Sequence, residues 1–191
     1  MKFSRIILIM IAMIIGHGET ASAQSMNDLL NMPNTHVILR HAFAPGTGDP
    51  VDFKLGDCST QRNLNASGQV QAIAIGELIK NRQLKIDRVY SSEWCRASDT
   101  AQLFKLGSDR VYTMQPLNSL WEKSEATKSL YKNNFIEELS QVKPDETLML
   151  VTHYANILAF TGLAVGSGVG VVIQVSDGRI EVLDKFELHN N

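Results

Sequence analysis

The chain has 191 residues, of which 44% are hydrophobic and 20% are charged, and this composition suits one globular domain with a sizeable core. Its formal net charge is −2 at pH 7. A mildly acidic domain has no electrostatic reason to bind nucleic acid or an anionic membrane, so any affinity for anions must be local. We therefore expect no nucleic-acid partner.

The N-terminal segment has the layout of a secretory signal. A basic start precedes the apolar run 6–16, and an Ala-Ser-Ala triplet that ends at Ala23 follows. The apolar run is too short to span a bilayer comfortably, and an uncleaved anchor is the alternative. We expect residues 1–23 to be a cleaved signal peptide and residues 24–191 to form a single domain. The protein is then periplasmic or secreted, without stable membrane insertion after cleavage.

The rest of the chain alternates predicted strands and helices. The residue pattern predicts, in chain order, a strand over 35–41, a helix over 67–83, a strand over 87–93, a helix over 96–107, a strand over 110–114, a helix over 125–142, a strand over 147–153 and a helix over 155–163. Two further β-runs are joined at Asp177-Gly178, which is a hairpin signal. Continuous apolar strands between helices predict a three-layer α/β/α fold, with a mostly parallel sheet and an antiparallel C-terminal edge.

Cationic and imidazole side chains follow three of the predicted strands. The first strand ends in Arg40-His41, the second leads to Arg96 at a helix start, and the last parallel strand ends in His153. Ligands of open α/β sheets bind beyond the carboxyl ends of the strands, so we expect these side chains to converge. Guanidinium groups bind phosphate oxygens bidentately, so the set predicts a pocket for a dianionic phosphoryl group. A structural role for each residue taken singly is the alternative.

Four motifs carry a resemblance to a known family. They are LRHA (39–42), RNLNASGQVQAIAIGELI (62–79), VYSSEWCRASDTA (89–101) and LVTHYANI (150–157). In order and spacing they resemble the histidine phosphatase superfamily, branch 1, which has the phosphoglycerate-mutase-like fold. The resemblance runs from about Thr35 to Leu163. Within that branch, an exported chain with two cysteines and an RHA motif is similar to periplasmic members, including those that act on phosphorylated heptose of the lipopolysaccharide core.

The resemblance implies a role for each residue of the predicted pocket. His41 is the expected nucleophile, and Arg62 is expected to border the pocket. Arg40, Arg96 and a protonated His153 would neutralise charge on the transferring oxygens. A phosphohistidine would form on the nucleophile and be hydrolysed by water. We expect no metal and no other cofactor, since the cations supply the positive field.

Ala42 stands where the family usually has glycine, which is acceptable if its backbone angles are ordinary.

For the proton donor to the leaving oxygen we favour Glu122, because Leu120-Trp121 would anchor the loop while the glutamate faces the pocket. Glu125 is the alternative, and some family members have no acid here.

The two cysteines lie next to predicted pocket residues. Cys58 precedes Arg62 by four residues, and Cys95 directly precedes Arg96. If both arginines border one pocket, the sulfur atoms are close enough to bridge, and we predict a disulfide that clamps the pocket wall. Two buried free thiols are the alternative.

These observations predict an exported, metal-independent phosphomonoesterase that works through a phosphohistidine. The expected partner is a small-molecule or glycan phosphate ester, including envelope-linked ones. The alternative is a non-catalytic module on the same fold that binds a phosphate or a phosphoglycan. The sequence predicts neither the physiological substrate nor the oligomeric state.

Overall fold

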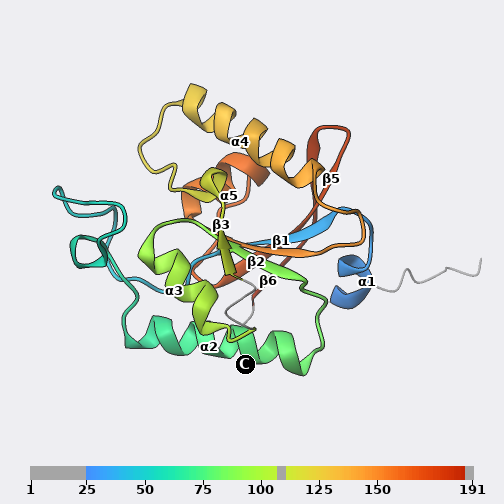
Figure 1. Ribbon diagram of the computed structural model, residues 1–191, viewed down its shortest axis with the longest axis horizontal. Helices are drawn as coiled ribbons and strands as arrows, with labels where there is room; N and C mark the ends of the chain where they lie inside the picture. Colours follow the sequence, from blue (N-terminus) through green and yellow to red (C-terminus); the bar gives the residue numbers. More distant parts are fainter. Residues whose placement is uncertain (1–24, 107–110, 188–191) are drawn as a thin grey trace, which may run out of the picture.

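The computed structural model describes residues 25–106 and 111–187 (Figure 1). The predicted signal peptide and the predicted helix end at Gly107 lie outside the described residues. In the described ranges, none of the helices has the length and apolar character needed to cross a membrane.

A mixed sheet forms the middle layer of the fold. The described residues contribute six strands: β1 (Thr35–Arg40), β2 (Arg88–Ser91), β3 (Val111–Thr113), β4 (Leu148–Thr152), β5 (Val169–Ser176) and β6 (Arg179–Glu187). Their order in the sheet is β3-β2-β4-β1-β5-β6. The first four are parallel, β5 is antiparallel to β1, and β6 is antiparallel to β5. The predicted mostly parallel sheet with an antiparallel C-terminal edge is confirmed.

Helices cover both faces of the sheet. They are α1 (Met26–Leu30), α2 (Ala66–Asn81), α3 (Cys95–Leu103), α4 (Glu125–Ser140) and α5 (Tyr154–Thr161), with the short 3₁₀ helices η1 (Cys58–Thr60) and η3 (Gln115–Leu117). In Figure 1, α2 and α3 lie on one side of the sheet, and α4 and α5 lie on the other. This is the three-layer α/β/α arrangement that the sequence pattern predicts.

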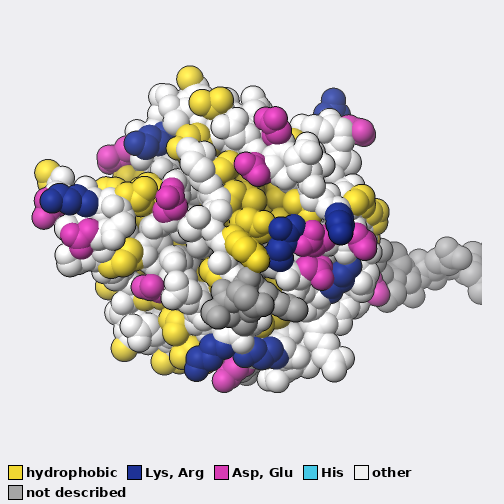
Figure 2. Space-filling model, in the orientation of Figure 1, with side chains coloured by type: hydrophobic (Ala, Val, Ile, Leu, Met, Phe, Trp, Pro, Cys, Tyr) yellow, Lys and Arg dark blue, Asp and Glu magenta, His cyan; other side chains and the backbone are white. Residues whose placement is uncertain are grey.

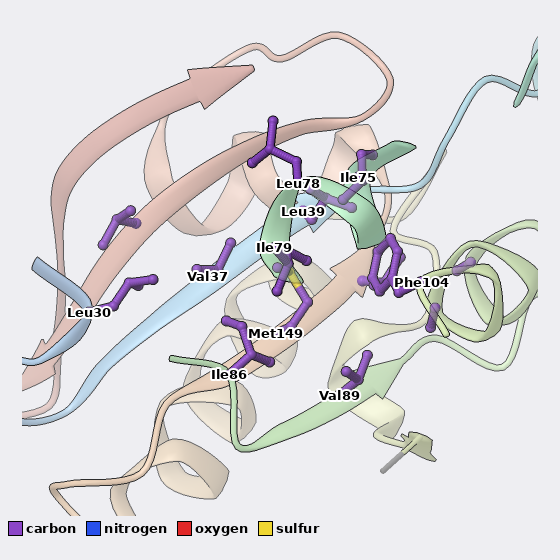
Figure 3. Close-up of a cluster of buried hydrophobic side chains, with 14 of the residues drawn as sticks. Leu30, Val37, Leu39, Ile75, Leu78, Ile79, Ile86, Val89, Phe104 and Met149 are labelled. Atoms are coloured by element: carbon purple, nitrogen blue, oxygen red, sulfur yellow. The ribbon is translucent and has the colours of Figure 1, made fainter. Parts of the chain in front are cut away.

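The strands contribute side chains to a hydrophobic cluster on each face. Successive side chains of a strand point to opposite faces. Val37 and Leu39 of β1 accordingly pack under α2, in the cluster drawn in Figure 3, whereas Ile38 joins the cluster under α4 and α5. In β4, Met149 packs in the cluster under α2 and Leu150 in the cluster under α4 and α5. Burial on both faces explains why these strands are apolar without interruption.

Two glycines allow α2 to lie directly against neighbouring backbone. The side chain of Asn65 caps the helix by accepting a hydrogen bond from the Gly68 amide. A Cβ atom at Gly68 would overlap the carbonyl of Phe43, and one at Gly76 would overlap the carbonyl of Phe104. The close approach at Phe43 fixes the chain two residues after His41, so α2 helps to position the end of β1.

The face of the molecule drawn in Figure 2 shows no single dominant charge among its described residues. On the face drawn in Figure 2, basic and acidic side chains of the described residues are interspersed, and no extended basic patch is visible there. That mixture agrees with the small formal net charge of the chain.

Candidate active site

A cavity of about 260 Å³ lies at the carboxyl ends of β1, β2 and β4. Its lining includes every residue predicted to form the phosphate pocket: Arg40, His41, Arg62, Arg96 and His153. Parallel strands end at the same edge of the sheet, so residues far apart in the sequence meet here. The structure therefore brings the five predicted residues together.

His41 is held as a neutral imidazole with a fixed tautomer. Its amide donates to the Thr152 carbonyl over 2.9 Å, and its Nδ1 lies 2.7 Å from the Ala42 carbonyl oxygen. A carbonyl oxygen only accepts hydrogen bonds, so Nδ1 carries the proton and Nε2 holds the lone pair. The side chain is 2% exposed, and burial together with the nearby arginines lowers the pKa of His41 to about 3. The ring is therefore unprotonated at neutral pH.

The alanine that replaces the usual glycine fits without strain. Ala42 is fully buried and is absent from the described residues with left-handed backbone angles. Its amide donates to Thr100 Oγ1 over 3.0 Å, and that hydroxyl donates in turn to the Arg96 carbonyl over 2.6 Å. The turn after His41 is thus tied to α3.

Two of the arginines are held by backbone carbonyl groups. Arg40 Nη1 donates to the Val165 carbonyl over 2.8 Å, and its guanidinium lies over the Tyr154 ring. Arg62 donates from Nε to the Gly48 carbonyl over 2.8 Å and from Nη1 to the Ala44 carbonyl over 2.6 Å. Carbonyl groups are neutral, so they orient both guanidiniums without cancelling their charge. Burial lowers the pKa of each arginine, but the guanidinium group stays protonated at any physiological pH.

Arg96 is held by a carboxylate that the sequence reasoning missed. Asp49 accepts from Arg96 Nη1 at 2.6 Å and from Nη2 at 3.1 Å. It also accepts from the Trp94 indole at 3.0 Å. Partial burial opposes ionisation of Asp49, but the hydrogen bond and charge of Arg96 outweigh it and lower the pKa of Asp49. Asp49 lies in a glycine-rich loop, and no spacing rule links such a loop to a helix start 47 residues later.

His153 lies beside the nucleophile. The two imidazole rings meet edge to face, with centroids 5.4 Å apart, and His153 Nε2 lies 2.8 Å from Ser92 Oγ. Burial, followed by the proximity of His41 and the arginines, lowers the pKa of His153 well below its ordinary value. The predicted protonated His153 therefore requires the negative charge of a bound phosphoryl group, which raises that pKa.

The predicted proton donor is not in this cavity. Glu122 and Glu125 are exposed and line an adjoining cavity of about 510 Å³. Leu120 is buried, as the anchoring role requires, but Trp121 is 44% exposed and forms part of the wall of both cavities. Trp121, and not Glu122, thus lines the phosphate cavity.

A disulfide joins Cys58 to Cys95, with Cα atoms 5.7 Å apart. Beside it, Gln61 Oε1 accepts a hydrogen bond from the Cys95 amide over 3.0 Å. These links connect η1, next to Arg62, to the first residue of α3. The structure thus contains the predicted bridge, and Cys95 directly precedes Arg96 of the cavity lining, but neither cysteine lines the cavity itself. Within the described ranges, no three His, Cys, Asp or Glu side chains are grouped as a metal site.

Comparison with known proteins agrees with this geometry. The model of the histidine phosphatase superfamily (branch 1) matches residues 37–124. No curated protein sequence matches the chain.

Solved structures share the fold. An alpha-ribazole phosphatase from Shigella flexneri is 17% identical with a TM-score of 0.58, over 78% of this chain and 94% of that one. A phosphoserine phosphatase from Entamoeba histolytica, bound to 3-phosphoglyceric acid, is 17% identical with a TM-score of 0.57, over 79% and 95%. The protein histidine phosphatase SixA, bound to tungstate, is 15% identical with a TM-score of 0.54, over 81% and 97%.

At such identities these structural likenesses concern the fold, and the family match adds the motifs that contain His41 and Arg96. Over residues 37–124 the chain is similar to branch 1 of the histidine phosphatase superfamily, and the described chain has the fold of the solved phosphatases named above.

Proposed function

We propose that the protein is an exported, metal-independent phosphomonoesterase that acts through a phosphohistidine on His41. The observation that carries this proposal is the state of His41. Its ring is neutral, its Nδ1 is bound to the Ala42 carbonyl, and its Nε2 lone pair shares one cavity with three guanidinium groups. This is what a nucleophile for a phosphoryl group requires.

The proposed reaction has two steps. In the first, His41 Nε2 forms a bond to phosphorus while the bond between phosphorus and the ester oxygen breaks, and the departing oxygen takes a proton. In the second, a water oxygen attacks phosphorus, the phosphorus–nitrogen bond breaks, and orthophosphate leaves. The attacking water gives one proton to the group that protonated the leaving oxygen, and the imidazole is restored. Arg40, Arg62 and Arg96 stabilise the charge on the phosphoryl oxygens throughout.

Unpaired polar atoms around the cavity support anion binding. Among the described residues, Arg40 Nε, Arg96 Nε and His153 Nδ1 are buried without a hydrogen-bond partner. Such atoms cost roughly 1–3 kcal/mol each, and the oxygens of a phosphoryl group are suitable acceptors for the two guanidinium N–H groups. SixA, which shares the fold, was solved with tungstate, a tetrahedral oxyanion. We infer that the cavity at the carboxyl ends of β1, β2 and β4 holds the phosphoryl group here.

Glu122 is our proposed proton donor. The adjoining cavity that it lines shares Trp121, Tyr154 and Ala155 with the phosphate cavity, so a leaving group that extends from one to the other would pass it. Glu122→Gln should slow hydrolysis of alkyl phosphates at least tenfold, because an alkoxide leaves poorly without a proton. Hydrolysis of p-nitrophenyl phosphate should change less than twofold. An equal effect on both substrates, or none on either, would exclude this role.

The two cavities support a proposal for the substrate class. We propose a small or envelope-linked phosphate ester whose phosphoryl group lies near His41 and whose alcohol portion enters the adjoining cavity. Export rests on the predicted signal peptide. N-terminal sequencing of protein recovered from the periplasm should begin at Gln24; retention of the full chain in the cytoplasm would rule export out.

The experiment that tests the activity is hydrolysis of p-nitrophenyl phosphate by the purified protein with a chelator present. We expect turnover that chelation leaves unchanged and that His41→Ala reduces at least a thousandfold, with unchanged melting temperature. Activity lost on chelation would show a metal enzyme. A folded wild type that binds orthophosphate but gives no turnover would favour the phosphate-binding module.

A further inference from the structure

Asp49 lies at the centre of a hydrogen-bond network in the cavity wall. Its two carboxylate oxygens accept from Arg96 Nη1, Arg96 Nη2, the Trp94 indole and the Arg62 amide, over 2.6, 3.1, 3.0 and 3.2 Å. The Asp49 side chain is 16% exposed and that of Arg96 is 3% exposed. The carboxylate accepts hydrogen bonds from both terminal nitrogens of Arg96, and this bidentate geometry fixes the orientation of the guanidinium.

The loop that carries Asp49 is itself fixed. This loop, residues 42–57, extends away from the sheet in Figure 1. Gly46 and Gly48 have left-handed backbone angles, and Arg62 donates to the Gly48 carbonyl directly before Asp49. Trp94, which also donates to Asp49, stacks on Phe53 from the same loop, with ring centroids 5.2 Å apart. Arg62 therefore supports this loop, and Arg96 is held by the Asp49 carboxylate that the loop carries.

Asp49 also changes the charge of the cavity. Three guanidinium groups and this carboxylate line it, so the four side chains have a formal charge of +2. A phosphoryl dianion carries −2. Because Asp49 lies on the guanidinium of Arg96, it reduces the attraction between the cavity and any anion that binds there.

We propose that Asp49 is a positioning residue that orients Arg96 for the phosphoryl group and weakens the retention of orthophosphate after hydrolysis. This inference rests on the proposed function, because it assumes that the cavity binds phosphoryl oxygens. Without the carboxylate, orthophosphate should bind more tightly while kcat falls. A purely structural role for Asp49 would not produce opposite changes in orthophosphate affinity and kcat.

The test compares Asp49→Asn and Asp49→Glu with the wild type, and Asp52→Asn serves as the matched control. Asp52 is exposed, belongs to the same loop and does not line the cavity. Orthophosphate binding is measured by calorimetric titration, and kcat is measured with p-nitrophenyl phosphate. For Asp49→Asn we expect a dissociation constant at least threefold lower and a kcat at least tenfold lower. Asp52→Asn should match the wild type in both.

Asp49→Glu keeps the charge but moves the carboxylate, so it separates the two effects. Its orthophosphate affinity should stay within twofold of the wild type while kcat falls at least fivefold, and this variant decides the question if Asp49→Asn does not fold. Orthophosphate binding by Asp49→Asn that is equal to or weaker than wild type would overturn the proposal, as would an unchanged kcat in Asp49→Glu. A wild type without hydrolysis would overturn the proposed function instead, and the orthophosphate titration would still decide the charge effect of Asp49.

Discussion

The disulfide between Cys58 and Cys95 should supply a large part of the stability of this domain. The bridge closes a loop with a sequence separation of 37. For a loop of that length, the chain-entropy relation gives about 13 cal/mol/K, or about 4 kcal/mol at 25 °C. Domains of this kind unfold with a free energy of about 5–15 kcal/mol in total. Loss of the bridge therefore leaves a protein that is folded but much closer to its unfolding midpoint.

The perturbation that tests this magnitude is the double variant Cys58→Ser, Cys95→Ser. Urea unfolding at pH 7 gives the free energy of unfolding of both proteins, and we expect a loss of 3–4 kcal/mol. Reductant should destabilise the wild type by a similar amount and leave the double variant unchanged, which controls for effects of serine. A loss below about 1 kcal/mol would contradict this magnitude and would mean that the unfolded chain gains little freedom from the open loop.

The same variant should affect catalysis only modestly. Gln61 still accepts from the Cys95 amide, and Asp49 still holds Arg96. We therefore expect kcat/KM to fall less than tenfold at temperatures where the variant is folded. A larger loss would mean that the bridge, and not these hydrogen bonds, sets the position of Arg96.

Three further changes test other parts of the structure. Gly68→Ala places a methyl group on the Phe43 carbonyl, so it should displace the turn after His41 and lower kcat/KM at least tenfold. Gly56→Ala is the control, because the space around Gly56 is open but its backbone is left-handed. This control should lower the melting temperature more than the turnover rate. Burial lowers the pKa of His36 to about 4. Between pH 6.5 and 4 the unfolded chain therefore binds more protons at this residue than the folded chain does. The free energy of unfolding should fall by about 2 kcal/mol on this account as the pH falls from 7 to 5. His36→Asn, which keeps an acceptor for the Leu148 amide, should lose that share of the pH dependence in urea titrations. Arg96→Lys should lower kcat/KM at least a hundredfold with little change in melting, because an ammonium cannot replace bidentate contacts; a change below tenfold would argue against contact with the phosphoryl group.

Much of the fold was predictable because its strands are buried on both faces. The apolar runs that became β1 and β4 end in Arg40 and just before His153, so their carboxyl ends could be identified from the sequence alone. The hairpin at Asp177-Gly178 was equally clear, since both residues have the left-handed backbone that such a turn needs. The short elements α1, η1 and η3 were missed, because three to five residues are too few to show a periodicity.

The parts of the site that were missed depend on loops. Asp49 reaches Arg96 only because Gly46 and Gly48 bend the loop and Arg62 holds it, and these contacts span long sequence distances. Glu122 has a left-handed backbone in the turn before α4, and no local residue pattern shows which neighbouring side chain will face the cavity. Strand ends could thus be assigned from the sequence, whereas loop conformations could not.

The proposed reaction requires the phosphoryl group to pass through His41. Rapid mixing with excess p-nitrophenyl phosphate, alkaline quench and mass spectrometry of the digested protein would locate any phosphorylated residue. We expect one phosphorylated peptide that contains His41, formed within the first turnover and absent from His41→Ala. Turnover with no phosphoprotein, or a phosphoryl group on His153 that persists in His41→Ala, would contradict the account.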